Sequence, residues 1–229
     1  YRYPGSGNPV VTNYQYDIAN RLTYVNAQAY TWDNNGPLLN NGAVIYTYDH
    51  ANRLASASMS GQPYTTFQYN GLGDRLSKNV DMGVQEYTLD LAGGLTQVLS
   101  DGTRTYQYGN GRIGEELPTG WQYYSSDGIG SVRQLIDHTG TVTLAKGYEL
   151  YGEVLDSTGS GSTSYGFTGE WTDSTGLVYL RARYYDPTTG RFMTRDTWGG
   201  DMNQPMSYND WLYGFANPIV NSDPSGLRP

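Results

Sequence analysis

Residues 14–22, YQYDIANRL, return almost unchanged as residues 46–54, YTYDHANRL. The alternation in Tyr-x-Tyr places both rings on one face of a strand. Asp, Ala and Asn then supply a turn, in which the Asp side chain can accept a hydrogen bond from the backbone two residues on. Arg-Leu begins the next strand, with the Leu facing inward and the stem of the Arg lying along a Tyr ring. The unit therefore predicts a β-hairpin.

Weaker copies of this unit continue along the chain. Its second aromatic residue recurs at Tyr16, Trp32, Tyr48 and Tyr69, at spacings of 16, 16 and 21 residues. Because successive hairpins can pair edge to edge and cover each other's unpaired backbone, the repeat predicts a continuous strip. Helical periodicity is lacking, so little helix is expected. The weaker copies are YTWD (30–33), FQYN (67–70) followed by DRL (74–76), YTLD (87–90) and YQYG (106–109).

The composition agrees with a folded β-protein. The 229 residues include 23 Tyr and 30 Gly against 4 Phe, and these residues favour pleated surfaces and tight turns. A net charge of −8 disfavours nucleic acid and anionic lipid as partners, and the absence of Cys excludes disulfides and thiolate chemistry. No apolar run is long enough to span a membrane, and the first residues, YRYPGSG, are expected to be an internal start that encodes no export route.

A second set of motifs begins at Gly166. Residues 166–200 read GFTGEWTDSTGLVYLRARYYDPTTGRFMTRDTWGG, and residues 211–227 read WLYGFANPIVNSDPSGL. Together with the repeats, they resemble the YD-repeat family of bacterial Rhs (rearrangement hotspot) proteins, insecticidal toxin-complex B and C components and animal teneurins. The second set is similar to the Rhs repeat-associated core. The resemblance covers essentially the whole chain.

The resemblance implies a fold and a division of the chain. The fold is all-β: a strip of YD-repeat hairpins (1–165) spirals into part of a hollow shell and is ended by the Rhs repeat-associated core (166–229). The stretch STGSGSTS (157–164) is predicted to be an exposed loop between the two by its composition. At 229 residues the chain is shorter than a closed shell needs, so it is expected to form one end of a shell or a compact member of the family.

The resemblance also implies a function and partners. Toxin-carrying members enclose a C-terminal polymorphic toxin and free it by cutting their own chain once, in the manner of an aspartic protease and without cofactor or metal. The implied partner is therefore the chain's own toxin cargo, which these 229 residues do not include. A secretion apparatus or a shell-completing domain is a further implied partner, and the implied location is secreted or cell-surface delivered in bacteria. A Tyr-rich, polar inner wall would hold such a cargo through weak contacts.

The self-cleavage site is assigned by position in the family motifs. The cut follows the Leu of a DPxGL motif, so the scissile bond here is Leu227–Arg228. Asp223 is the Asp of that motif, and Asp196 stands where the family has the Asp of RFxSxDP. The resemblance therefore implies that both are catalytic, and Arg195 directly precedes Asp196 as a candidate orienting group.

Such chemistry needs two carboxylates in one site. One ionised carboxylate activates water while the other, protonated, donates to the carbonyl oxygen, and their mutual repulsion pushes the two pKa values apart. An adjacent Arg can orient a carboxylate or stabilise the oxyanion. The alternative is that Asp223 and Asp196 only cap turns, as Asp beside Pro or Gly commonly does. Two departures from the family bear on this: Asp196 precedes Thr-Trp instead of Pro, and the polar stretch 199–210 is longer than usual and contains a third candidate, Asp210.

Other functions and sites were weighed against this interpretation. The same strip could be an extracellular adhesion or carbohydrate-binding scaffold of the teneurin kind, with exposed rings that stack on partners, or an inactive shell fragment that self-associates through its edges. Arg181, Arg183 and Arg191 are expected to stack on Tyr rings and pair with carboxylates instead of binding a ligand. His50 and His138 have no third ligand nearby in sequence, so no metal site is predicted.

Overall fold

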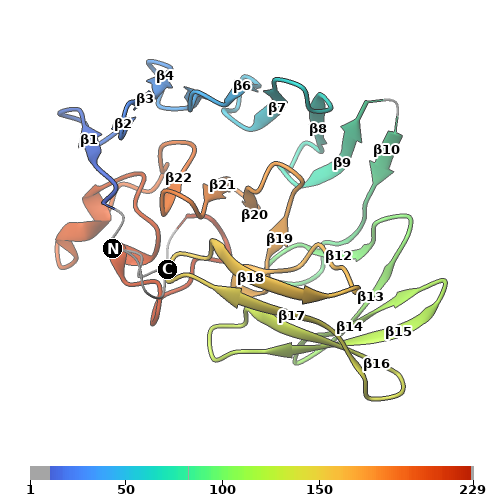
Figure 1. Ribbon diagram of the computed structural model, residues 1–229. Helices are drawn as coiled ribbons and strands as arrows, with labels where there is room; N and C mark the ends of the chain where they lie inside the picture. The colour runs from blue at the N-terminus through green and yellow to red at the C-terminus, as the bar shows by residue number, and fades with distance from the viewer. Residues whose placement is uncertain (1–10, 82, 228–229) are drawn as a thin grey trace.

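The computed structural model describes residues 11–81 and 83–227, in which the chain is nearly all antiparallel β-structure (Figure 1). The strands of the repeat region pair in chain order within three consecutive sheets. The first sheet contains β1 (Tyr14–Tyr16), β2 (Leu22–Val25) and β3 (Gln28–Ala29). The second contains β4 (Thr31–Trp32), β5 (Leu38–Asn40), β6 (Val44–Tyr48), β7 (Leu54–Met59), β8 (Thr65–Tyr69), β9 (Arg75–Val80) and β10 (Gly83–Glu86).

The third sheet is the largest. It contains β11 (Thr88–Asp90), β12 (Gln97–Ser100), β13 (Thr105–Gly109), β14 (Gly111–Leu117), β15 (Gly120–Ser126), β16 (Val132–Asp137), β17 (Val142–Tyr148) and β18 (Val154–Gly159). The prediction of a loop over residues 157–164 is therefore partly wrong, because β18 extends through Gly159 as an exposed edge strand paired with β17. We refer to the three sheets together as the wall.

Residues 165–227, which we call the C-terminal segment, lie on the concave side of the wall, between the β4–β8 arc and the large third sheet (Figure 1). This segment forms a fourth sheet and three short 3₁₀ helices, which are the only helices among the described residues. The elements are η1 (Phe167–Gly169), β19 (Trp171–Thr172), β20 (Val178–Leu180), β21 (Arg183–Asp186), β22 (Arg191–Phe192), η2 (Pro205–Tyr208) and η3 (Gly214–Ala216). The prediction of an all-β chain with little helix is confirmed.

The repeat unit folds as its sequence predicts. Asp49 Oδ1 accepts hydrogen bonds from the backbone N–H groups of Ala51 (2.9 Å) and Arg53 (3.0 Å), and its Oδ2 accepts one from Arg53 Nε (2.7 Å). Asp17 repeats this pattern in the first unit. The Arg53 guanidinium lies over the Tyr69 ring, 4.9 Å from its centroid. Asp in the YD motif is thus a turn cap, and the Arg–Tyr stacking predicted from the sequence is present.

A hydrogen-bond ladder that the sequence did not suggest connects successive units. In each case an aromatic residue at or next to the end of a strand donates to a backbone carbonyl at or next to the start of an earlier strand, for example Tyr48 Oη to Leu38 O at 2.9 Å. The ladder ties each ring to its neighbour and so fixes the spacing along the wall. Its other members are Trp32 to Leu22 (2.7 Å), Tyr69 to Leu54 (2.8 Å), Tyr108 to Val98 (2.8 Å) and Tyr148 to Val132 (3.0 Å).

The copy of the unit at residues 67–76 departs from the predicted register. Tyr48 pairs with Leu54 across its hairpin, whereas Tyr69 pairs with Arg75. Arg75 therefore occupies the inward position and is 3% exposed, while Leu76 is 41% exposed. The prediction that Leu76 faces inward is wrong. The loops after Tyr48 and Tyr69 have the same length, but the copy at Tyr69 has one more residue before its Arg-Leu. The inward position therefore falls on Arg75 instead of Leu76.

Buried Arg75 joins the wall to the C-terminal segment. Its Nη1 donates to Asp173 Oδ2 at 2.5 Å and to Tyr184 Oη at 2.7 Å. The rings of Tyr179 and Tyr87 lie 4.3 and 4.9 Å from the guanidinium carbon and give it cation–π contacts. The guanidinium of Arg75, which would be costly to bury alone, is thus paired with a carboxylate and surrounded by aromatic rings.

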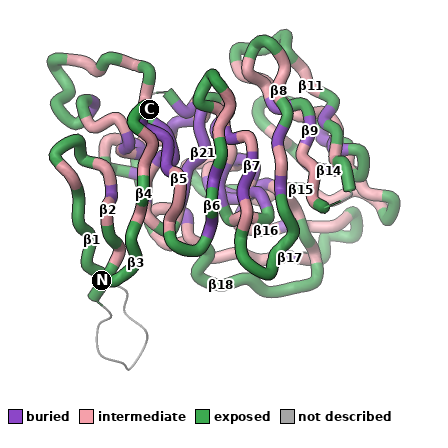
Figure 2. The backbone as a smooth tube through the Cα atoms, turned by 90° about the horizontal axis from the view of Figure 1, so that it is seen from above, coloured by how far each residue is buried: buried purple, intermediate pink, exposed green. Residues whose placement is uncertain are grey.

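Two apolar clusters complete the seam between wall and C-terminal segment. One packs Leu38, Val44, Tyr46, Leu54, Ala57 and Phe67 of the wall against Leu177, Tyr184 and Met193. The other packs Tyr87, Tyr106, Val132, Leu135 and Leu144 against Tyr165 and Trp171. Buried residues accordingly concentrate where the two parts meet (Figure 2). These inward Tyr rings contact the chain's own C-terminal segment instead of lining an open groove.

Candidate functional site

The candidate site is built at the tip of the β20–β21 hairpin. Leu180 pairs with Arg183 across a two-residue turn formed by Arg181 and Ala182. Arg181 has φ of +58°, a left-handed conformation that suits such tight turns. The turn points Arg181 and Arg183 toward the last described residues of the chain, where both donate hydrogen bonds to backbone carbonyls.

Three consecutive residues of this tip hold three consecutive carbonyl groups of the DPSGL motif. Arg181 Nη1 donates to Pro224 O at 2.6 Å, and the Ala182 backbone N–H donates to Ser225 O at 3.2 Å. Arg183 Nε donates to Gly226 O. We call this set of contacts the clamp, and it ends one residue before Leu227.

The DPSGL motif is itself a tight turn. Asp223 Oδ1 accepts hydrogen bonds from Ser225 Oγ (3.0 Å) and from the Leu227 backbone N–H (3.1 Å). Gly226 has φ of +73°, and a Cβ at this position would lie 2.3 Å from Leu180 O. Only glycine therefore lets the turn seat against the hairpin tip.

Asp196 and Asp223, which the sequence placed 27 positions apart, meet at one guanidinium. Arg183 Nη2 lies 2.6 Å from Asp196 Oδ2 and 3.5 Å from Asp223 Oδ2. The side chains of Arg183 and Asp223 are 4% and 1% exposed, and that of Asp196 is 11% exposed. The Arg183 guanidinium also lies over the Phe192 ring, 3.5 Å from its centroid. Two carboxylates and one cation thus share a nearly dry site.

Burial sets the protonation tendencies of the site. Burial raises the pKa of Asp196 above its ordinary value, although the neighbouring Arg183 opposes the rise. Burial likewise lowers the pKa of Arg183, against the opposing effect of Asp196 and Asp223. A carboxyl group with a raised pKa is suited to holding a proton and donating it.

Arg195 and Asp210 lie beside this site without converging on it. Arg195 Nε pairs with Asp210 Oδ2 at 2.6 Å, and the Arg195 side chain is 63% exposed. Both line a separate surface cleft of about 710 Å³ with the first repeat loops. The backbone carbonyl of Asp210 accepts hydrogen bonds from Arg183 Nη1 (2.9 Å) and from the Asp196 N–H (3.0 Å), while its carboxylate acts on these two residues through its charge.

The orienting position expected for Arg195 is therefore occupied by Arg183. The sequence predicts only stacking and ion pairing for Arg183, and the available signal was its spacing of two residues from Arg181, which lies in the turn before β21. A catalytic role for Arg195 or Asp210 stays a prediction, and Arg228 lies outside the described residues.

Among residues 11–81 and 83–227, no group of three His, Cys, Asp or Glu side chains is arranged to hold a metal ion. Within the same ranges, no helix has both the length and the apolar character needed to cross a membrane.

Comparison with known proteins places the chain in a family. The family model described as Teneurin YD-shell matches residues 1–219. The chain belongs to this family. Two sequence relatives are the tRNA nuclease WapA of Bacillus subtilis (strain 168), 30% identical over 96% of this chain, and Teneurin-3 of Mus musculus, 28% identical over 93% of it. The YD-shell chain spans only 10% and 8% of the lengths of these two relatives.

Solved structures agree on the fold. The crystal structure titled TcdB2-TccC3-TEV has a TM-score of 0.65 with the YD-shell chain, at 19% identity, over 94% of this chain and 13% of that one. The crystal structure of TcdB2-TccC3 without the hypervariable C-terminal region also has a TM-score of 0.65, at 20% identity, with the same coverage. At such identities the likeness supports the YD-shell fold alone.

Proposed function

We propose that this chain is the closing part of a toxin-carrying YD-shell and cuts its own backbone once, after Leu227. The observation that carries the proposal is the meeting of Asp196 and Asp223 at Arg183, beside a clamped turn that leads directly to Leu227. A turn cap alone would not need a second carboxylate from 27 residues away.

The geometry suggests a role for each group. Asp223, which already accepts hydrogen bonds within the turn, acts as base and takes a proton from water as the water oxygen attacks the Leu227 carbonyl carbon. Asp196, whose pKa burial raises, donates its proton to the carbonyl oxygen. Arg183 holds both carboxylates and the Gly226 carbonyl in place.

Collapse of the resulting intermediate completes the cut. Asp223 passes its proton to the amide nitrogen of Arg228, the C–N bond breaks, and a hydroxyl proton returns to Asp196. The products are a carboxyl group on Leu227 and an amino group on Arg228, so no atom or charge is left unbalanced. Each chain performs this step once, because its only substrate is its own backbone.

Enclosure of the cargo is proposed for the longer protein. The concave face of the wall is occupied by the C-terminal segment in the described residues, so further shell would have to surround the cargo. Relatives named as tRNA nucleases favour a nuclease as the class of cargo, freed from the shell by the cut. Such a function requires a secreted or cell-surface-delivered protein, and a secretion apparatus or shell-completing domain as its partner.

An adhesion or carbohydrate-binding scaffold is the second candidate. Teneurin relatives at 28–29% identity favour it. The packing of the inward Tyr rings against the C-terminal segment weighs against a ring-lined groove as the binding surface.

The test is the intact mass of a fusion that extends past Pro229 into a folded reporter. We expect the wild-type fusion to split between Leu227 and Arg228, and Asp223→Asn to stay intact. Asn retains an oxygen that accepts from the Leu227 N–H, so it preserves the turn cap while removing the base. Ser225→Ala removes one contact of the same carboxylate without touching its charge and should still cut. A folded wild-type fusion that stays uncut would overturn the proposal and favour the scaffold.

A further inference from the structure

Arg181 makes contacts that the hairpin turn does not require. A left-handed φ of +58° is most easily met by Gly or Asn, whereas an Arg there carries conformational strain. Its side chain is nevertheless only 16% exposed and reaches three separate segments of the chain. The presence of Arg at position 181 is therefore explained by the contacts of its side chain and not by the conformation of the turn.

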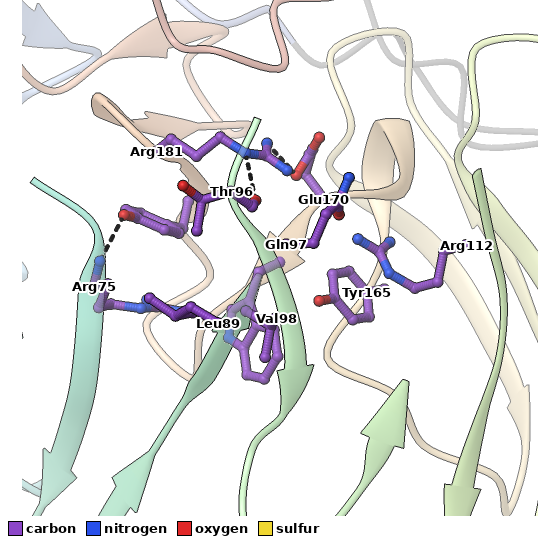
Figure 3. A pocket seen from close by; sticks show the side chains of 11 residues that line it. Arg75, Leu89, Thr96, Gln97, Val98, Arg112, Tyr165, Glu170 and Arg181 are labelled. Atoms are coloured by element: carbon purple, nitrogen blue, oxygen red, sulfur yellow. Dashed lines mark hydrogen bonds and ion pairs between the residues drawn. The ribbon is translucent and has the colours of Figure 1, made fainter. Parts of the chain in front are cut away.

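The three contacts join the wall, the C-terminal segment and the cleavage turn. Arg181 Nη1 donates to Glu170 Oε2 (2.8 Å) and to Pro224 O (2.6 Å), and Nε donates to Thr96 O (3.2 Å). Thr96 directly precedes β12 of the large third sheet. Figure 3 shows Arg181 reaching both Thr96 and Glu170 at the edge of a cavity of about 30 Å³. Arg181 thus connects the clamp to the start of β12.

Glu170 fixes the direction of the Arg181 side chain. Glu170 is 8% exposed and follows η1, where its backbone N–H donates to Phe167 O. Burial raises the pKa of Glu170, and Arg181 opposes the rise. Because a buried carboxylate needs a cation, the pair is held together, and the remaining donors of Arg181 are aimed at Pro224 and Thr96.

We infer that Arg181 is a positioning residue for self-cleavage, which seats the Pro224 carbonyl and makes the cut depend on a formed third sheet. The inference rests on the proposed self-cleavage. When β12 is in place, Thr96 and Glu170 lock Arg181, and the clamp brings Leu227 toward Asp196 and Asp223. Without the sheet, Arg181 loses an anchor and the turn is free to leave the site. The shell would then release its cargo only after its own wall has folded.

The test compares Arg181→Gly with Arg191→Ala in the reporter fusion. Gly accepts the left-handed backbone without strain, so a defect reports the missing guanidinium. Arg191 is a matched control, since its guanidinium also joins the C-terminal segment to the wall, through a hydrogen bond to Asn20 O (3.0 Å) and a contact with the Tyr16 ring (4.6 Å from the centroid). We expect Arg181→Gly to slow cleavage by about 10²-fold, the usual effect of misplacing a reacting group, and Arg191→Ala to leave the rate unchanged.

Two further readouts separate positioning from loss of structure. Methylguanidinium added to Arg181→Gly should restore part of the rate by filling the vacated space, and should not affect Arg191→Ala. Hydrogen exchange at the amides of Gly226 and Leu227 should be faster in Arg181→Gly than in wild type, measured with Asp196→Asn in both chains so that neither cuts. A wild-type fusion that fails to cut removes the self-cleavage proposal, and the exchange measurement still tests the clamp. Equal cleavage by wild type and Arg181→Gly, or equal exchange in the paired uncut chains, would overturn the inference.

Discussion

Two buried Arg–Asp groups in this molecule have opposite charge balances. At the seam between wall and C-terminal segment, the single carboxylate of Asp173 is shared by Arg75 (2.5 Å) and Lys78 (3.3 Å). At the candidate site, the single guanidinium of Arg183 is shared by Asp196 and Asp223. Two cations around one carboxylate attract it and need no proton to move, whereas two carboxylates around one cation repel each other, so that one of them tends to keep a proton. The first arrangement suits a permanent joint and the second suits proton transfer.

The largest expected effect is at the seam. Arg75→Ala breaks the buried pair and leaves Lys78, at 3.3 Å, as the remaining cation at Asp173, so we expect the free energy of unfolding to fall by about 3 kcal/mol. Arg53→Ala is the matched control, because its pair with Asp49 is 28% exposed on both sides and contributes about 1 kcal/mol or less. Chemical denaturation followed by Trp fluorescence measures both. Equal losses of unfolding free energy in the two variants would show that Arg75 does not hold the C-terminal segment to the wall.

The next effect tests the clamp without altering any charge. A Cβ on residue 226 would collide with Leu180 O, so Gly226→Ala should displace the turn and slow cleavage by about 10²-fold. The change lies near the end of the described chain, and residue 226 belongs to neither of the two apolar clusters at the seam, so the denaturation midpoint should move little compared with Arg75→Ala. Gly61→Ala is the control for a glycine with positive φ and open space around it. Unchanged cleavage in Gly226→Ala would mean that the cut does not need the seated turn.

The sequence and the structure agree where contacts are local. Hairpins, turn-capping Asp and Arg–Tyr stacking follow from residues within one repeat. The error at Leu76 arose because DRL looks like NRL, although counting from the turn residue Asn70 would have placed Arg75 inward. The role of Arg183 could not be predicted from its own strand, because its carboxylates come from a later loop and from a turn that folds back on the hairpin tip.

The pH dependence of cleavage sharpens the comparison of the two groups. Asp196 must be protonated to act as the acid, and its raised pKa means that this form is lost as pH rises through that value. We expect the rate to fall from mildly acidic to mildly alkaline pH, by up to about tenfold per pH unit above the pKa. Uncut fusion recovered in denaturant is diluted into buffers across this range, and the product is followed by mass. A rate that is flat or rises with pH would contradict the assignment of Asp196 as the acid.

The smallest expected effect is at a carboxylate that only caps a turn. Burial acts to raise the pKa of Asp49, but hydrogen bonds from Arg53 and Ala51 outweigh it, so the folded-state pKa is lowered. The stabilisation by Asp49 is therefore present above the unfolded-state pKa and is lost as pH falls through the folded-state value. Asp49→Asn should cost about 1 kcal/mol or less at neutral pH, and wild type and variant should converge in acid.

Cleavage gives the contrast between this cap and Asp223. Because Asp49 has no second carboxylate beside it, Asp49→Asn should leave the rate and its pH profile unchanged, while the isosteric change at Asp223 abolishes the cut. Both substitutions retain a turn-capping oxygen, so turn formation alone predicts the same outcome for both. A slowed cut in Asp49→Asn would mean that cleavage follows the general stability of the repeats. Cleavage would then no longer report on the pair of carboxylates at Arg183.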